Sequence, residues 1–255
     1  MRTSDNGSQS LIWPDSFQGI CDNRAAMTTA VKICGLKTPG AVAAAVDAGA
    51  AYLGFVFYPR SPRSLSVEDA ERLAAPYRGM ARIVALTVDA DDTLIDEINE
   101  TLAPDIFQLH GSETPDRVAG IKQHAAKRVM KALRVSAPED VARASAYAEA
   151  ADLILFDAKP KNGEGLGLPG GNGIPFDWQL LHGLDLAVPY MLSGGLTPEN
   201  VAEAVRLTGA PIVDVSSGVE DAPGEKNTDK IRAFIHAARA AGEAPVKEST
   251  VEHID

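Results

Sequence analysis

Eight short apolar runs rich in β-branched residues alternate with Ala-rich amphipathic segments, and this alternation predicts an α/β fold, a single (β/α)8 TIM barrel. A chain of 255 residues is long enough, because one such barrel takes roughly 250 residues. The competing fold is a doubly wound open sheet, which usually has fewer βα units and often begins with a GxGxxG turn. The first turn of this chain lacks that pattern, so the eight units favour the closed barrel.

Strands and helices alternate regularly, except that a Gly-rich stretch and no predicted helix follows the sixth strand. The predicted strands span residues 30–34, 52–57, 82–88, 106–110, 128–133, 153–157, 189–193 and 212–216. The predicted helices span residues 39–48, 66–75, 92–102, 115–125, 138–148, 198–208 and 228–241. Four helices begin with a proline, whose missing N–H costs nothing at the first helical position, namely Pro39, Pro115, Pro138 and Pro198.

Three segments fall outside this pattern. Residues 1–28 are polar and aperiodic, and we expect them to be a flexible extension before a barrel and catalytic domain at residues 29–242. Residues 243–255 are rich in Glu and are expected to be a flexible tail. The Gly-rich stretch 159–176 follows the sixth predicted strand, which favours an active-site lid over a plain surface loop.

The composition narrows the function classes. A net charge of −11 argues against binding to nucleic acid or to anionic lipid. Cys21 and Cys34 are too few for a disulfide scaffold, and no Cys/His spacing suggests a metal site. The chain has no apolar run of membrane-spanning length and no secretory signal. We therefore expect a cytoplasmic protein that binds a small molecule and no metal.

Two Gly-containing loops follow the last two predicted strands. Loops at this place in barrels commonly hold phosphate. In LSGGL, Gly194 and Gly195 let the backbone approach an anion closely, and in VSSGV the segment Ser216, Ser217 and Gly218 adds N–H groups and hydroxyls. Two ordinary tight turns are the alternative, but their position on adjacent strands favours a phosphate site.

Three further residues stand at predicted strand ends or in the loops beyond them. Cys34 ends the first strand, where it is either a small core residue or a reactive thiol. Asp157 ends an otherwise apolar strand, where burial is costly unless the carboxylate has a partner or a role. Position alone leaves both alternatives open. Arg63 in YPRSPRS would suit a carboxylate substrate if it turned inward, whereas Arg60 is expected in solvent.

An ordered set of motifs resembles the phosphoribosylanthranilate isomerase family. The set covers residues 31–241 and consists of KICG, GFVFYPRSPR, QLHG, the Asp157 strand with GGNG and FDW, LSGGLTPENV and VDVSSGVE. The resemblance implies that Cys34 is the general base, that Asp157 is the general acid and that Arg63 holds the anthranilate carboxylate. This chain departs from the family in its long N-terminal extension and in a longer loop through residues 162–169, and neither departure removes a motif residue.

The implied reaction is an Amadori rearrangement of N-(5-phosphoribosyl)anthranilate in tryptophan biosynthesis. It involves no net redox change, so no cofactor is expected. A thiol base would benefit from a lowered pKa. His110 either touches the substrate or is only a satisfied rim histidine, and Asp214 either orients a substrate group or does not. We expect a monomer, with a dimer as the alternative.

Two rival functions remain at this stage. One is the related aldose–ketose isomerase of histidine biosynthesis, which is expected to use Asp at the position of Cys34. The other is a non-catalytic barrel that binds a phosphorylated ligand and needs neither Cys34 nor Asp157. The presence of both residues argues against each rival.

Overall fold

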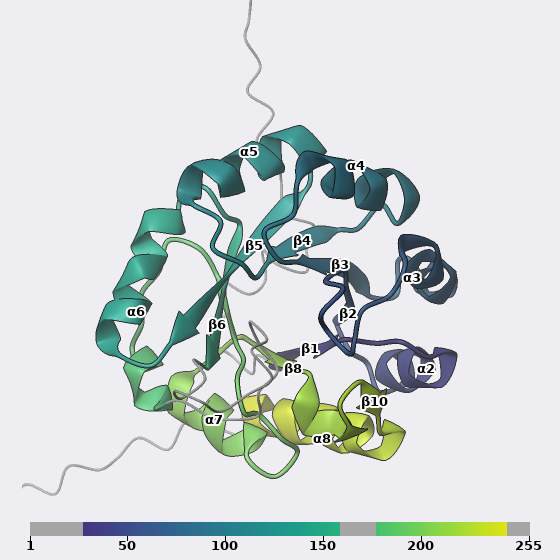
Figure 1. Cartoon of the computed structure of the whole chain (residues 1–255). Helices are drawn as coiled ribbons and strands as arrows, with labels where there is room; N and C mark the ends of the chain where they lie inside the picture. The colour runs from purple at the N-terminus through teal and green to yellow at the C-terminus, as the bar shows by residue number, and fades with distance from the viewer. Residues whose placement is uncertain (1–27, 159–176, 244–255) are drawn as a thin grey trace, which may run out of the picture.

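Eight parallel strands close into a barrel in chain order, with β8 hydrogen-bonded to β1 (Figure 1). The computed structural model describes residues 28–158 and 177–243. The strands are β1 (Ala30–Cys34), β2 (Tyr52–Val56), β3 (Arg82–Thr87), β4 (Ile106–Leu109), β5 (Arg128–Val135), β6 (Leu153–Ala158), β7 (Tyr190–Leu192) and β8 (Ile212–Val215). The predicted TIM barrel is therefore confirmed.

Helices form a ring outside the strands (Figure 1). They are α2 (Pro39–Asp47), α3 (Val67–Ala74), α4 (Asp92–Thr101), α5 (Pro115–Ala125), α6 (Pro138–Ala142), α7 (Val201–Thr208) and α8 (Thr228–Glu243). Short 3-10 turns add η1 (Ala75–Tyr77), η2 (Arg143–Tyr147), η3 (Trp178–Leu181) and η4 (Ser217–Val219), and a hairpin joins β9 (Glu220–Ala222) to β10 (Glu225–Lys226). The sequence did not predict these turns or the hairpin.

The helix ends test the predicted boundaries. Thr38 and Thr114 cap α2 and α5, since their side chains accept hydrogen bonds from backbone N–H groups three residues on. The predicted start at Pro198 is wrong, because α7 begins at Val201. There the Asn200 side chain accepts from Thr197 N at 2.7 Å and donates to Gly195 O at 2.9 Å, which holds the preceding residues in a turn. The helix predicted over 138–148 is α6 followed by the 3-10 turn η2.

The interior of the barrel has an apolar part and a polar part. Successive side chains of a strand point to opposite faces, so alternate positions of every strand face the lumen. Apolar lumen residues form one cluster, namely Tyr52, Val84, Ile106, Met130, Ala132, Leu153, Leu155, Met191 and Ile212. Further along the strands, toward their carboxyl ends, lie the buried polar side chains Lys32, Gln108, His110, Asp157 and Asp214. The fold therefore gathers ionisable groups at one mouth of the barrel.

Several expectations concern segments outside the described residues. The expected lid at 159–176 lies entirely outside them, as do residues 1–27 of the expected extension and 244–255 of the expected tail. Within residues 28–158 and 177–243, no helix is both long and apolar enough to cross a membrane.

Candidate active site

The thiol of Cys34 lies at the carboxyl end of β1 and is only 4% exposed. Gly54 of β2 is its neighbour in register, and a Cβ at Gly54 would come within 3.1 Å of the Cys34 sulfur and 3.2 Å of Lys32 Cε. The missing side chain therefore makes room for both groups. Burial raises the pKa of Cys34, Lys32 opposes the rise and Asp214 adds to it. The lowered thiol pKa that a base would favour is not what this arrangement produces.

A buried ion pair spans β1 and β8 beside the thiol. Lys32 Nζ lies 2.9 Å from Asp214 Oδ1, and the Lys32 side chain is fully buried. Ser193 donates to the other carboxylate oxygen at 3.2 Å. Burial lowers the pKa of Lys32, but Asp214 and Cys34 outweigh that effect and raise it above the ordinary value. Sequence reasoning missed Lys32, although its place two residues before Cys34 on one strand face was a usable signal.

Gln108 and His110, in β4 and directly after it, form a chain of hydrogen bonds to the carboxylate of Asp157 near the end of β6. His110 Nε2 lies 3.2 Å from Asp157 Oδ2, and Gln108 Nε2 lies 3.2 Å from His110 Nδ1. With this orientation of the Gln108 amide, the neutral ring carries its proton on Nε2 and donates it to Asp157. The Ala158 N–H donates to the second oxygen at 3.0 Å. His110, whose role the sequence left open, thus contacts the predicted acid directly.

Arg63 is turned inward, as a carboxylate-binding role would need, whereas Arg60 is exposed. Arg63 Nε donates to Glu220 Oε1 at 2.8 Å, and Arg63 Nη2 donates to Glu220 Oε2 at 2.7 Å. Lys226 Nζ reaches the same carboxylate at 2.6 Å. Gly35 has a φ of +77°, and a Cβ there would lie 2.6 Å from Arg63 Cδ, so this glycine makes room for the arginine side chain. The sequence assigned no role to Glu220 or Lys226.

The two predicted phosphate loops touch each other. Gly194 and Gly195 have φ values of +87° and +67°. A Cβ at Gly218 would lie 1.9 Å from Leu196 O, so the loop after β8 packs directly on the loop after β7. Within the described residues, the N–H groups of Gly194 and Gly195 have no hydrogen-bond acceptor. These donors are therefore free to meet an anion.

The serines of the second loop differ in their contacts. The Ser216 hydroxyl donates to Cys34 O at 3.1 Å, and Lys226 Nζ donates to Ser216 O at 2.9 Å. Ser217 begins the 3-10 turn η4, whose first N–H groups have no acceptor within the turn itself. Ser216 is therefore bonded to the backbone of Cys34 and to Lys226, whereas binding of phosphate by Ser216, Ser217 and Gly218 stays a prediction.

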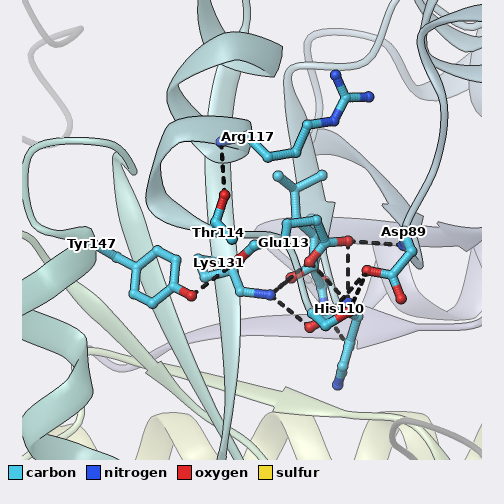
Figure 2. Close-up of polar contacts among 11 residues, drawn as sticks. Asp89, His110, Glu113, Thr114, Arg117, Lys131 and Tyr147 are labelled. Carbon is cyan, nitrogen blue, oxygen red and sulfur yellow. Dashed lines mark hydrogen bonds and ion pairs between the residues drawn. The ribbon is translucent and has the colours of Figure 1, made fainter.

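A second buried ion pair braces the other side of the mouth (Figure 2). Lys131 Nζ lies 2.6 Å from Glu113 Oε2, and both side chains are buried. Glu113 also accepts from the N–H groups of Asp89 and Gly111, and its backbone carbonyl accepts from the Tyr147 hydroxyl. This network ties the loops after β3 and β4 to β5, directly beside His110.

A cavity of about 380 Å³ lies against this brace, lined by residues that include Val88, Ser112, Lys131, Ala132 and Tyr147. None of the predicted site residues lines it. The Lys131 ammonium already bonds to Glu113 and to Gly111 O at 2.8 Å, so it offers little to an anionic ligand. Within the described part of the chain, no group of three or more His, Cys, Asp or Glu is placed to hold a metal ion.

The fold and the site together define an enzyme of the (β/α)8-barrel class, with its functional groups at the carboxyl ends of the strands. The family model described as N-(5'phosphoribosyl)anthranilate (PRA) isomerase matches residues 31–237, and the chain belongs to this family. The predicted resemblance is thus confirmed, and the two rival functions are set aside.

Individual relatives agree with this assignment. The N-(5'-phosphoribosyl)anthranilate isomerase of Parvibaculum lavamentivorans is 55% identical over 215 residues, which is 84% of this chain and 100% of the relative. The crystal structure of the Thermotoga maritima phosphoribosyl anthranilate isomerase is 35% identical, with a TM-score of 0.75, and covers 83% of this chain and 99% of its own. A phosphoribosyl anthranilate isomerase in complex with reduced 1-(o-carboxyphenylamino)-1-deoxyribulose 5-phosphate gives a TM-score of 0.72 at 35% identity, with the same coverage.

Proposed function

We propose that this protein catalyses the Amadori rearrangement of N-(5'-phosphoribosyl)anthranilate to 1-(2-carboxyphenylamino)-1-deoxyribulose 5-phosphate in tryptophan biosynthesis. The observation that carries the assignment of roles is that Cys34 and Asp157 lie buried at one barrel mouth, on strands that are not neighbours. The two groups therefore face one substrate from different sides. Cys34 is the general base and Asp157 the general acid.

In the first step, the carboxyl group of Asp157 protonates the ring oxygen of the sugar. The C1–O bond breaks, and the anilino nitrogen supplies its lone pair to form an iminium ion. His110 supports this step by holding Asp157 Oδ2 at 3.2 Å, which fixes the direction of the carboxyl group.

In the second step, the thiolate of Cys34 removes the proton from C2. The electrons of that C–H bond form a C1=C2 double bond, and the iminium nitrogen becomes neutral. The resulting enolamine then loses the proton of its C2 hydroxyl and gains one at C1, which gives the ketone. Atoms and electrons balance within the substrate, so the reaction calls for no redox cofactor.

The binding roles follow from the available donors. The N–H groups of Gly194 and Gly195, which have no acceptor among residues 28–158 and 177–243, support a phosphate site together with those of Ser217 and Gly218. The guanidinium of Arg63 would pair with the anthranilate carboxylate through Nη1 or by exchanging Glu220 for it.

Asp214 has both carboxylate oxygens engaged, one by Lys32 and one by Ser193. We therefore assign it to holding Lys32, and its predicted contact with the substrate stays a prediction, since each carboxylate oxygen can accept a second hydrogen bond. We also infer that the protein acts in the cytoplasm and as a monomer. Light scattering across a concentration series tests the monomer, since a doubled mass would identify the alternative dimer.

The decisive assay follows the fluorescence of freshly made N-(5'-phosphoribosyl)anthranilate with and without the protein. Cys34→Ser and Asp157→Asn should each lower kcat by about 100- to 10,000-fold, because each removes a proton-transferring group. Both variants should still bind inorganic phosphate with the parent affinity. A parent protein without turnover would overturn the proposed function, and a near-normal kcat in either variant would overturn that residue's role.

A further inference from the structure

A fully buried ammonium group lies next to the thiol of Cys34. Lys32 and Cys34 are two residues apart in β1, so both side chains point into the lumen. The glycine at position 54 brings them together, because a Cβ there would stand 3.1 Å from the sulfur and 3.2 Å from Lys32 Cε. The end of the lysine side chain and the thiol thus share one hollow in the barrel wall.

The bonding of Lys32 fixes where its charge sits. Asp214 accepts from Nζ at 2.9 Å, and Ser193 in turn holds Asp214 at 3.2 Å. An ammonium group has three donors, and this anchor uses one of them. Asp214 therefore keeps the lysine charged and directed toward β8, without covering the side that faces Cys34.

Few charged groups face the thiol from the surrounding elements. Lys32 comes from its own strand, Asp214 from β8 and Lys226 from β10. The neighbouring strands β2 and β3 contribute the uncharged residues Gly54, Val56 and Leu86. Lys226 donates to Glu220 at 2.6 Å and to Ser216 O at 2.9 Å, so the carboxylate of Glu220 offsets its charge. Burial raises the thiol pKa, and Lys32 opposes that rise more than Lys226 does.

We propose that Lys32, anchored by Asp214, is a positioning residue whose ammonium group stabilises the thiolate of Cys34 and so makes a buried thiol usable as a base. The proposal rests on the assignment of Cys34 as the general base. In the working enzyme the thiol proton leaves to solvent, the anion remains beside the ammonium group, and the sulfur then takes the C2 proton of the substrate.

The expected shift of the Cys34 pKa follows from the charge that Lys32→Met removes. An opposite charge within about 4–6 Å shifts a pKa by roughly 1–3 units toward the ionised form. Lys32→Met keeps the length and loses the charge, so the thiol pKa should rise by about 1–3 units. At a fixed pH below that pKa, the rate of alkylation should fall by about 10- to 1,000-fold, because only the thiolate reacts.

The experiment measures the alkylation rate by iodoacetamide against pH, in full-length protein with Cys21→Ser so that Cys34 is the remaining thiol. Lys131→Met is the matched control, because Lys131 is also a buried lysine in an ion pair but belongs to β5 and contacts Glu113 (Figure 2). Lys32→Arg keeps a cation. We expect a raised thiol pKa in Lys32→Met alone, and a return toward the parent value in Lys32→Arg. The pH at which kcat/KM rises should move with the thiol pKa.

An unchanged thiol pKa in Lys32→Met, or an equal change in Lys131→Met, would overturn the proposal. If Lys32→Met does not fold because Asp214 is left unpaired, Lys32→Met with Asp214→Asn leaves no lone buried charge. Its thiol pKa should still exceed the parent's, since Lys32 influences the thiol more than Asp214 does. A shifted thiol pKa together with full turnover in Cys34→Ser would instead overturn the assignment of Cys34 as base, so the two failures are distinguishable.

Discussion

Replacing Arg63 with alanine removes the two guanidinium donors that hold Glu220 at 2.8 and 2.7 Å. A buried charge left with no partner would cost about 3–5 kcal/mol. Glu220 keeps Lys226 at 2.6 Å, so the smaller penalty for lost charge-assisted hydrogen bonds applies, about 1.5–3 kcal/mol. For a domain of this size, each kcal/mol lowers Tm by about 2–4 °C, so Arg63→Ala should melt about 3–12 °C below the parent.

Arg63→Ala should also distinguish recognition of the anthranilate part of the substrate from recognition of its phosphate part. If Arg63 reads the anthranilate carboxylate, Arg63→Ala should raise KM for the full substrate by about 10- to 150-fold and leave binding of ribose 5-phosphate nearly unchanged. The assays are thermal unfolding by circular dichroism and steady-state fluorescence kinetics. Arg60→Ala is the matched control in the same loop, and its exposed side chain should contribute within about 0.5 kcal/mol.

Three results would contradict these expectations. An Arg63→Ala protein that melts with the parent would mean that the Glu220 pair contributes nothing to stability. Equal losses for ribose 5-phosphate and the full substrate would mean that Arg63 serves the phosphate or the fold. A larger kinetic effect at Arg60 would mean that the wrong arginine of the loop was chosen.

Three further outcomes are expected. Gly194→Ala should lower Tm and weaken binding of inorganic phosphate, because its left-handed φ of +87° costs about 1–2 kcal/mol and the new Cβ would lie 2.3 Å from Ala158 N, whereas Gly120→Ala in open space on α5 should not; a stable, phosphate-binding Gly194→Ala protein would contradict the loop geometry. Burial raises the pKa of Tyr190 from 10.0 to about 12, so the contribution of its neutral phenol to stability is fully present below about pH 10 and is lost as the pH rises toward 12. Urea unfolding across that range should show a smaller loss of stability in Tyr190→Phe than in the parent, and equal losses would contradict this expectation. Deleting residues 1–26 should leave Tm and kcat unchanged, because the family match begins at residue 31, and a lower Tm would reveal a contact with the barrel.

Much of the fold could be predicted because its signals are local. The strand β1 and the helix α5 have the predicted bounds, since β-branched runs, helical periodicity and a capping Thr before Pro act over a few neighbouring residues. The predicted start of α7 at Pro198 was wrong because a side-chain contact opposes the local signal. Thr197-Pro198 has the sequence of a helix start, but the Asn200 side chain bonds back to Thr197 and Gly195 and delays the helix.

The partners of the buried charged side chains could not be predicted from the sequence, because they come together only when the barrel closes. The sequence by itself determined the barrel class, the family and the strand ends where Cys34, Asp157 and the two Gly loops would stand. Only the tertiary structure decided that Lys32 meets Asp214, 182 residues away, and that Arg63 meets Glu220, 157 residues away. A local pattern records which face a side chain takes. The partner that makes a buried charge tolerable is known only once β8 closes against β1 and the loops cross the mouth.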